Sequence, residues 1–377
     1  MIQDVYIIGA TGNVGKELVS QIFVRGDTDS NRHVNPTRIV GLASSTHTLY
    51  LHEGISPDQA YAFTGKRYGD AHADTYIDHG ELIDRARYGF RNGGSTLVFV
   101  DVTPLKQEMT KFHLQVIRDT PYGLVTANKN PIASSDYAVF KELTANIRRY
   151  GYRCSVMAGA EAIPFIRDAR DVNDPIYSVK GCLSGTNGFI TSELEKYGGD
   201  ENPRRLSDIV REAHKIGYTE PHPRDDLSGI DVARKLVIIA RSMGLSVGME
   251  NVLREGLVPK EYLREDDVLK FLDNLVNLDS DFAERMANAK GHGSTLRYVA
   301  SIDMQGETPV LEVSLKEVSQ ENLLGMLKGT KNQVVITTKT FSDGYLIGPL
   351  PGAGIDVTAQ NVRRDLLYLL SDRRDHP

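Results

Sequence analysis

The strongest constraint on the fold is a glycine-spaced turn near the start of the chain. An apolar stretch at 5–9 leads into GATGNVG at 9–15, and an amphipathic stretch follows at 16–23. Strand, glycine turn and helix in this order are typical of a Rossmann-like α/β fold, where the helix N-terminus offers amide donors to a pyrophosphate. A sharp turn that binds no ligand is the alternative. The residues that would cradle a dinucleotide are Gly9, Thr11, Gly12, Asn13, Val14 and Gly15.

Polar residues follow further apolar strands that the sequence predicts at 38–43, 97–100 and 124–126. Ligands bind at the carboxyl ends of the strands in an open parallel sheet. We therefore expect Thr103, Asn128 and Lys129 to face the cofactor. Lys129 can instead be a solvated loop lysine, which is the commoner fate of a single lysine.

The end of the second predicted strand bears on cofactor preference. Folds that prefer NAD usually place an acidic residue there to hold the ribose 2′-hydroxyl, whereas this chain has Ser-Ser-Thr-His at 44–47. Ser44 and Ser45 can donate to a 2′-phosphate, and His47 or Arg67 can add positive charge. The sequence therefore predicts NADP(H) as the preferred cofactor and NAD(H) as the second choice.

From about residue 151 the pattern becomes that of an α+β domain. We expect strands at 177–183 and 309–313 and helices at 207–214, 231–243 and 268–277. A glycine-rich turn at 348–359 should lead into a helix at 360–370 that returns to the first domain. The predicted dinucleotide-binding domain therefore comprises 1–155 plus 340–377, and the second domain comprises 156–339.

Charged residues gather between Ala213 and Lys235. If a helix begins near Ser228, Asp231 and Lys235 form an i,i+4 pair beside its apolar stripe. Burial shifts the pKa values of such groups toward the range where proton transfer is efficient, so this stretch is a candidate active site. The alternative is a capping box at Ser228 with an exposed ion pair worth about 0.2–0.5 kcal/mol.

Charge and cysteine content exclude several classes of partner. The net charge is −6 with Lys and Arg scattered, so neither a nucleic-acid surface nor a membrane-binding patch is indicated. No apolar run approaches the roughly 20 residues that span a bilayer, and the N-terminus reads as a strand rather than a signal peptide. Cys154 and Cys182 lie outside any C-x-x-C motif, so we expect core thiols in a reducing cytoplasm.

These motifs together resemble the homoserine dehydrogenase family. The stretch from Ala213 to Lys235 matches the family signature A-x3-G-[YF]-[TS]-E-x-D-P-x-x-D-[IL]-x-G-x-D-x3-K, except that His222 replaces an acidic or amide residue. The resemblance implies reversible oxidation of homoserine to aspartate 4-semialdehyde by a nicotinamide cofactor, a step toward threonine, isoleucine and methionine. Further matches follow in the family's order: VDVT at 100–103, TANK at 126–129, SGTNGFI at 184–190 and PGAGIDVTA at 351–359.

The resemblance also assigns roles to residues. Lys129 and Lys235 are the candidates to exchange the hydroxyl proton, and Asp231 would orient Lys235. Glu220 and Asp226 would bind the substrate ammonium, with Thr186 at the amino-acid end. The residues of the late glycine-rich motif that would line the cofactor site are Gly352, Ala353 and Gly354.

Some properties of the family do not carry over directly. The stretch at 154–164 is similar to the family's V-G-A-G-L-P segment, whose carbonyls bind a monovalent cation in some members, but it is about two residues longer. We therefore assign no metal. The resemblance implies a short monofunctional enzyme that acts on a small molecule as a homodimer, formed through the second, dimerisation domain.

Two other functions compete with this one. An aspartate-semialdehyde dehydrogenase would share the glycine turn, but it needs a cysteine nucleophile, and neither Cys154 nor Cys182 has a matching context. A dinucleotide-sensing regulator without turnover would have no need of the carboxylates and both lysines.

Overall fold

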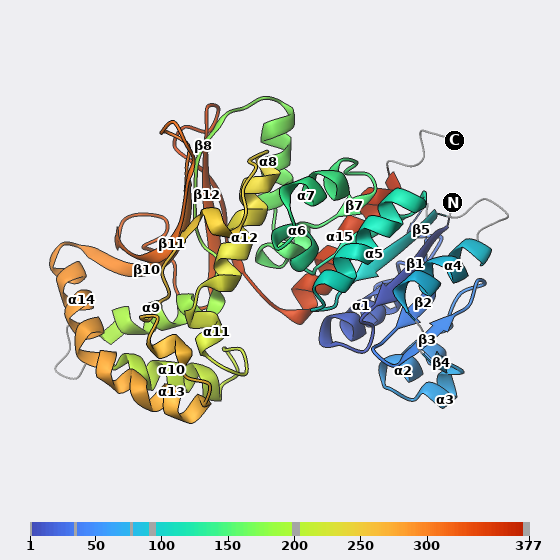
Figure 1. Cartoon of the computed structure of the whole chain (residues 1–377), viewed down its shortest axis with the longest axis horizontal. Helices are drawn as coiled ribbons and strands as arrows, with labels where there is room; N and C mark the ends of the chain where they lie inside the picture. Colours follow the sequence, from blue (N-terminus) through green and yellow to red (C-terminus); the bar gives the residue numbers. More distant parts are fainter. Residues whose placement is uncertain (1, 34–35, 76–77, 90–95, 198–203, 372–377) are drawn as a thin grey trace. The chain divides into compact units, whose positions relative to one another are not determined.

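The computed structural model describes residues 2–371 apart from 34–35, 76–77, 90–95 and 198–203 (Figure 1). The chain forms two compact units: unit 1 comprises 1–159 and 354–377, and unit 2 comprises 160–353. Each unit is built on its own β-sheet. The α/β class expected from the sequence is confirmed.

Unit 1 contains a seven-stranded, mostly parallel sheet. Its strands are β1 (Gln3–Ile8), β2 (Thr37–Ala43), β3 (His47–Tyr50), β4 (Asp74–Thr75), β5 (Thr96–Asp101), β6 (Gly123–Thr126) and β7 (Tyr150–Gly151), in the order β4-β3-β2-β1-β5-β6-β7. β1 pairs in parallel with both β2 and β5, so the strand order reverses beside β1. In open α/β sheets this switch point, at the carboxyl ends of the strands, is where ligands bind. The Rossmann-like first domain is therefore present as predicted.

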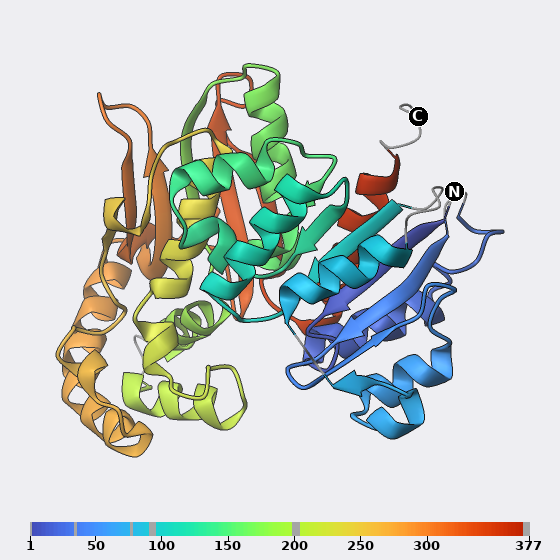
Figure 2. The ribbon, with the colours of Figure 1, turned by 45° about the vertical axis from the view of Figure 1, so that its right-hand side comes forward.

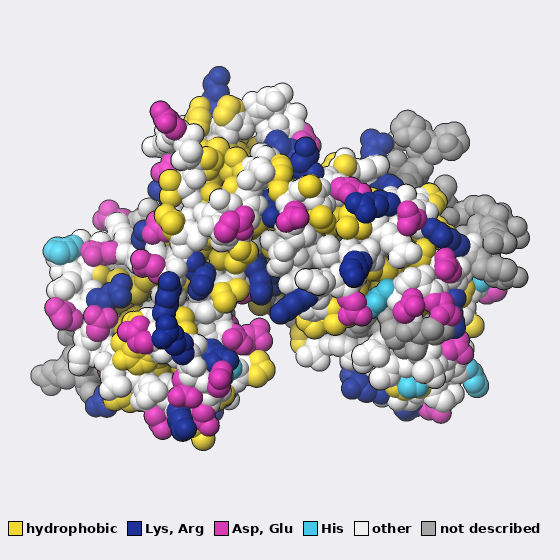
Figure 3. All heavy atoms as spheres, viewed as in Figure 1, with side chains coloured by type: hydrophobic (Ala, Val, Ile, Leu, Met, Phe, Trp, Pro, Cys, Tyr) yellow, Lys and Arg dark blue, Asp and Glu magenta, His cyan; other side chains and the backbone are white. Residues whose placement is uncertain are grey.

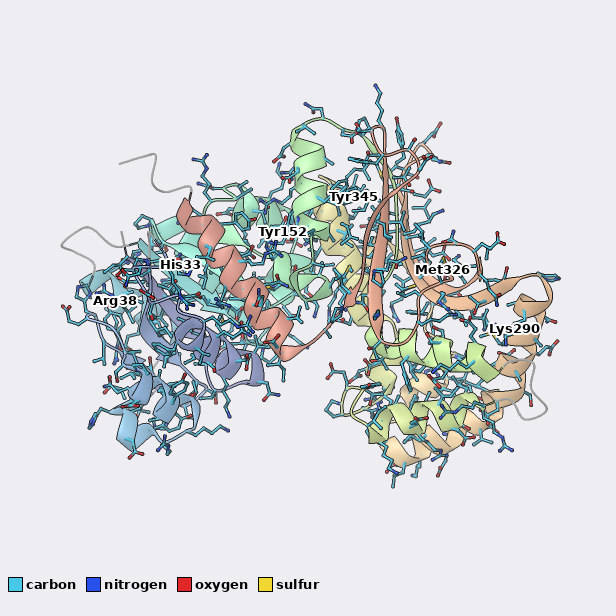
Figure 4. The ribbon with its side chains drawn as sticks, turned by 180° about the vertical axis from the view of Figure 1, so that it is seen from behind. His33, Arg38, Tyr152, Lys290, Met326 and Tyr345 are labelled. Carbon is cyan, nitrogen blue, oxygen red and sulfur yellow. The ribbon has the colours of Figure 1, made fainter. Side chains whose placement is uncertain are left out.

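Helices cover both faces of this sheet. They are α1 (Asn13–Val24), α2 (Pro57–Thr64), α3 (Tyr68–Ala71), α4 (His79–Gly89), α5 (Gln107–Asp119), α6 (Asn130–Ala133), α7 (Tyr137–Thr144) and α15 (Ile355–Ser371). Figure 1 shows α5 in front of the strands, and Figure 4, drawn from behind, shows α15 in front of them. Val362 and Leu366 of α15 join Leu18 and Ile22 of α1 in the apolar core. The C-terminal helix thus belongs to unit 1, as expected.

Unit 2 contains a six-stranded sheet in the order β13-β12-β8-β10-β11-β9. Its strands are β8 (Ile176–Cys182), β9 (Val252–Arg254), β10 (Ser294–Asp303), β11 (Val310–Ser319), β12 (Lys331–Thr338) and β13 (Tyr345–Pro351). Its helices are α8 (Ala162–Asp171), α9 (Gly185–Tyr197), α10 (Leu206–Lys215), α11 (Arg224–Leu227), α12 (Ile230–Ser242), α13 (Val268–Asn274) and α14 (Asp279–Gly291). α9 and α12 pack against β10, while α10, α13 and α14 gather at one end of the strands (Figure 2).

The late glycine-rich segment differs from the sequence expectation. Residues 345–351 form β13, which pairs with β12, so 340–353 lie in unit 2 rather than in the first domain. Gly348 and Pro349 stand opposite the single residue Gln333, so the bulge is in β13, and a Cβ on Gly348 would lie 2.7 Å from the Asn332 carbonyl oxygen. Glycine here serves a bulged strand rather than a turn. The final helix then begins at Ile355, earlier than the predicted residue 360.

The surface agrees with the scattered charge pattern of the sequence. On the face drawn in Figure 3, Lys and Arg side chains alternate with Asp and Glu over both units. Among the described helices, none is both long and apolar enough to cross a membrane.

Candidate active site

The glycine turn of unit 1 has the geometry of an anion cradle. Gly9 has φ +87°, Gly12 is the N-cap of α1, and a Cβ on Gly15 would lie 2.3 Å from the Gly9 carbonyl oxygen. Only glycine fits this close approach of helix to strand. The amides of the first helical turn have no partners within the helix, and Gly12 and Asn13 are exposed. The Gly12 amide donates to the Gly9 carbonyl at 3.0 Å, so the N–H groups of the first turn of α1 itself, with the helix dipole, are the ones suited to a pyrophosphate.

The loop after β2 is ordered by its own hydrogen bonds. Ser44 is 8% exposed, and its Oγ accepts from the amides of Thr46 and His47 at 3.2 and 3.0 Å. Tyr68 donates to the same oxygen at 3.3 Å and stacks on the His47 ring at 3.7 Å. Ser44 therefore shapes the loop, whereas Ser45 is exposed and available to a ligand.

Asp101, at the end of β5, links the two loops that carry the predicted cofactor-facing residues. Its Oδ1 accepts from the Thr103 amide and hydroxyl at 2.8 and 2.7 Å, and its Oδ2 accepts from Asn128 Nδ2 at 3.0 Å. Asn128 also donates to the Leu105 carbonyl at 2.7 Å. Thr103 and Asn128 thus fix the sheet edge, and Lys129 follows half-buried as the N-cap of α6.

In unit 2, the half-buried carboxylate of Asp226 organises the charged stretch. Thr186 Oγ1 lies 2.9 Å from Asp226 Oδ1 and 2.7 Å from the Tyr218 carbonyl oxygen. Asp226 Oδ2 accepts from the Glu220 amide at 2.7 Å. Burial raises the Asp226 pKa to about 6, reinforced by the charges of Glu220 and Asp231 and opposed by the two hydrogen bonds. Thr186, Glu220 and Asp226 are therefore brought together as the sequence suggested.

Lys235 lies at the inner side of α12. It is 8% exposed, and its Nζ lies 2.9 Å from Asp231 Oδ2 and donates to the Leu183 carbonyl at 2.7 Å. An ammonium or amine in this setting is held by a carboxylate and a carbonyl, an arrangement suited to proton exchange. The alternative of an exposed surface pair is wrong for the lysine, while Asp231 remains half-exposed.

The capping box that was the alternative at Ser228 is absent. α12 begins at Ile230, and its N-cap, Gly229, has no side chain that could cap the helix and adopts φ +71°. A Cβ on Gly229 would lie 1.9 Å from the Tyr298 hydroxyl oxygen. Ser228 Oγ instead donates to the Asp225 carbonyl at 2.8 Å.

His222, the departure from the family signature, packs inside unit 2. Its ring makes an edge contact with Phe271 at 5.2 Å, and its Nδ1 accepts from the Arg224 amide at 3.3 Å. The imidazole thus supports the fold beside the charged stretch.

Sequence reasoning missed three groups of unit 2 that contact the predicted site residues. One is Asn187, whose Nδ2 donates to the Asp226 carbonyl at 3.2 Å and whose place in the SGTNGFI motif could have indicated it. The other two are the backbone carbonyls of Leu183 and Tyr218. No sequence pattern could have indicated them, since every residue has a backbone carbonyl.

The three predicted residues of the late glycine-rich motif are divided between the units. Gly352 and Ala353 lie in unit 2 and Gly354 lies in unit 1. Gly352 lies against Asn332, whose side chain a Cβ would meet at 1.9 Å.

The segment similar to the family's cation-binding stretch follows directly after a buried ion pair. Arg153, with its side chain 8% exposed, places Nε 2.6 Å from Asp365 Oδ1. The Ala158 carbonyl accepts from Asn361 Nδ2 at 2.8 Å. The described residues contain no cluster of three or more His, Cys, Asp or Glu suited to a metal. The Arg153 guanidinium beside this segment is thus paired with a carboxylate of α15.

Both thiols have the character of core groups. Cys154 and Cys182 are buried, and burial raises the pKa of Cys154 well above its usual value and that of Cys182 to about 12. Because the thiolate is the nucleophile, neither cysteine suits acyl-enzyme chemistry.

Comparisons with known proteins point to one family. The family described as homoserine dehydrogenase matches residues 163–367. The chain is 31% identical over 366 residues to a bifunctional aspartokinase/homoserine dehydrogenase of Zea mays, covering 97% of this chain but 38% of that protein, so it spans about two fifths of that relative. It is 33% identical over 257 residues to homoserine dehydrogenase of Emericella nidulans, covering 66% of this chain and 69% of that protein. A mutant hyperthermophilic archaeal homoserine dehydrogenase in complex with NADPH has a similar fold, with TM-score 0.73, 21% identity and full coverage of both chains.

Proposed function

The chain belongs to the homoserine dehydrogenase family, and from this premise we propose that it interconverts L-homoserine and L-aspartate 4-semialdehyde with a nicotinamide dinucleotide. The observation that carries the proposal is the pair of polar clusters in unit 2: Asp226 with Thr186 and the Glu220 amide, and Lys235 with Asp231 and the Leu183 carbonyl. An assay that follows NADPH formation from homoserine tests it. Absence of turnover with tight dinucleotide binding would instead favour a sensing regulator.

We propose that lysine handles the proton of the reacting oxygen. A bound nicotinamide cofactor supplies the hydride acceptor or donor. Neutral Lys235 Nζ accepts the hydroxyl proton when the alcohol is oxidised, and its ammonium returns it when the aldehyde is reduced. Asp231 and the Leu183 carbonyl hold Nζ in place for both directions. Lys129, beside Asn128 in unit 1, is the second candidate for this role.

The substrate ammonium is assigned to Glu220 and Asp226. Asp226 is partly withdrawn from water and already fixed by Thr186 and the Glu220 amide, so its carboxylate is positioned before substrate arrives. Glu220 is exposed and adds a second negative charge. Fixing the amino-acid end of homoserine orients its alcohol for the transfer.

Homoserine binding is expected to weaken as the pH falls through about 6, where Asp226 in the free enzyme becomes protonated. An ordinary aspartate would stay charged down to about pH 4. The homoserine KM measured between pH 5 and 8 should therefore rise on the acid side, while the KM for the dinucleotide stays flat. In Asp226→Asn the homoserine KM should no longer rise on the acid side. If it still rose at the same pH in that variant, the titrating group would be another residue.

We propose NADP(H) as the preferred cofactor, because no carboxylate follows β2 to repel a 2′-phosphate. The kcat/KM for NADP should at least equal that for NAD. Ser45→Asp, at the exposed position of the loop, should shift the preference toward NAD by charge repulsion, and Ser45→Asn serves as the uncharged control. Strong preference for NAD in the unmodified protein would contradict the proposal.

We further propose a cytoplasmic enzyme of threonine, methionine and isoleucine biosynthesis that forms a homodimer through unit 2. Large apolar side chains are exposed around its sheet, including Met326 at 62% and Tyr345 at 37% (Figure 4). Exposed apolar groups of this kind are typical of association surfaces. The buried thiols argue against aspartate-semialdehyde dehydrogenase chemistry.

A further inference from the structure

A chain of buried polar groups lies beneath the sheet edge of unit 1 that carries Lys129. Tyr150 of β7, His113 of α5 and Asp101 of β5 are all 0% exposed. The Tyr150 hydroxyl lies 2.8 Å from His113 Nδ1, and His113 Nε2 lies 3.2 Å from Asp101 Oδ2. Three elements distant in sequence thus meet through one imidazole.

A neutral His113 can form both hydrogen bonds of this chain in only one of its two tautomers. The Asp101 carboxylate can only accept, so His113 presents Nε2–H to it. The unprotonated Nδ1 then accepts from the Tyr150 hydroxyl, which keeps its proton because burial raises the Tyr150 pKa well above its usual value. The other tautomer would direct a lone pair at the carboxylate. Asp101 accordingly selects the tautomer of His113, and the Tyr150 hydroxyl supports that tautomer by donating to Nδ1.

Asp101 transmits this orientation to two loops. Its Oδ1 fixes the Thr103 amide and hydroxyl, and its Oδ2 fixes Asn128 Nδ2. Asn128 Oδ1 in turn accepts from the Asn130 amide at 3.0 Å. The backbone that carries Lys129 is therefore held on both sides by groups that depend on Asp101.

We propose that His113 is a positioning residue for the proton-transfer step. By holding the Asp101 carboxylate in one orientation, it fixes Asn128 and thereby the placement of Lys129. This inference rests on the proposed function, in which Lys129 is the second candidate, beside Lys235, to exchange the proton of the substrate hydroxyl. A small misplacement of such a group can cost as much as about 10²-fold in rate.

The proposal is tested with a matched pair of variants at the histidine. His113→Leu removes the donor to Asp101, whereas His113→Gln places an amide N–H near the position of Nε2. We expect the first to lower kcat for homoserine oxidation about 10-fold or more with little change in the homoserine KM, which unit 2 sets. The second should recover most of the rate. An equal loss in both variants, or none in His113→Leu, would overturn the proposal.

Hydrogen exchange gives a readout that does not depend on turnover. The amides of Thr103 and Asn130 should exchange faster in His113→Leu than in His113→Gln or the unmodified protein. The Arg148 amide, which a separate side chain, Asn146 Oδ1, caps at 2.9 Å, is the control and should not change. If His113→Leu does not fold, His113→Asn takes its place, because the shorter amide can contact Tyr150 but does not reach Asp101: it should speed exchange at the same two amides, and unchanged exchange would reject the coupling. Lack of turnover in the unmodified protein would reject the proposed function instead.

Discussion

Replacing Lys235 by methionine is expected to lower kcat for homoserine oxidation by about 10²-fold or more, the usual loss for removal of an acid–base group. Methionine keeps much of the apolar stem and fills the buried site, but it cannot exchange a proton or bond to the Leu183 carbonyl. NADPH affinity, measured by fluorescence titration, should stay nearly unchanged because the glycine turn lies in unit 1. Lys129→Met should show the same pattern.

The controls for this prediction are exposed lysines in each unit. Lys270 of α13 and Lys111 of α5 are both exposed and take no part in the proposed chemistry. Lys270→Met and Lys111→Met should turn over like the unmodified enzyme. Wild-type kcat in Lys235→Met or in Lys129→Met would reject the assignment of that lysine.

Removing either ammonium-binding carboxylate is expected to raise the homoserine KM by about 10- to 100-fold. A charge-assisted hydrogen bond is worth about 1.5–3 kcal/mol, which corresponds to that range. Asp226→Asn is the sharper test, because it removes the charge while the amide keeps much of the shape that Thr186 and the Glu220 amide contact. Glu220→Ala tests the second carboxylate. Steady-state kinetics with homoserine varied at saturating dinucleotide give both values.

Asp225→Asn is the matched control for the carboxylates. Asp225 adjoins Asp226, but its side chain is 65% exposed and lies 4.0 Å from Arg224 Nε. Its removal should leave the homoserine KM unchanged. If neither Glu220→Ala nor Asp226→Asn raised KM, the ammonium would have to be bound elsewhere.

Local patterns in the sequence were enough for the glycine turn and for the Asp231–Lys235 pair. Both depend on residues close in sequence, through a strand-turn-helix order in one case and an i,i+4 spacing in the other. The helix start was predicted to within two residues, since α12 begins at Ile230. The alternative capping box at Ser228 is absent because the Tyr298 hydroxyl, from a strand far along the chain, leaves room only for glycine at the N-cap, residue 229. No periodicity within the stretch carries that information.

The polar chain below the sheet edge could not be predicted for a similar reason. Asp101 was visible only as a residue of the VDVT motif after a strand, and His113 as a single histidine in an amphipathic helix. Their hydrogen bond depends on how α5 packs on the sheet. The sequence could not predict either that the Ser44 hydroxyl points into its own loop, where it accepts from the His47 amide. The residue types of the site were predictable from the sequence, whereas the directions of their side chains depend on tertiary packing.

The return of α15 to unit 1 has a consequence for the order in which the protein forms during translation. Domains generally fold as they emerge, with the N-terminal domain first. Here Val362 and Leu366 complete the core beside Leu18 and Ile22, and Arg363 neutralises the buried Asp27. Val362, Arg363 and Leu366 exist only after the ribosome has made all of unit 2. The unit that begins first is therefore completed last, and its unfinished sheet stays exposed to chaperones and proteases for most of synthesis.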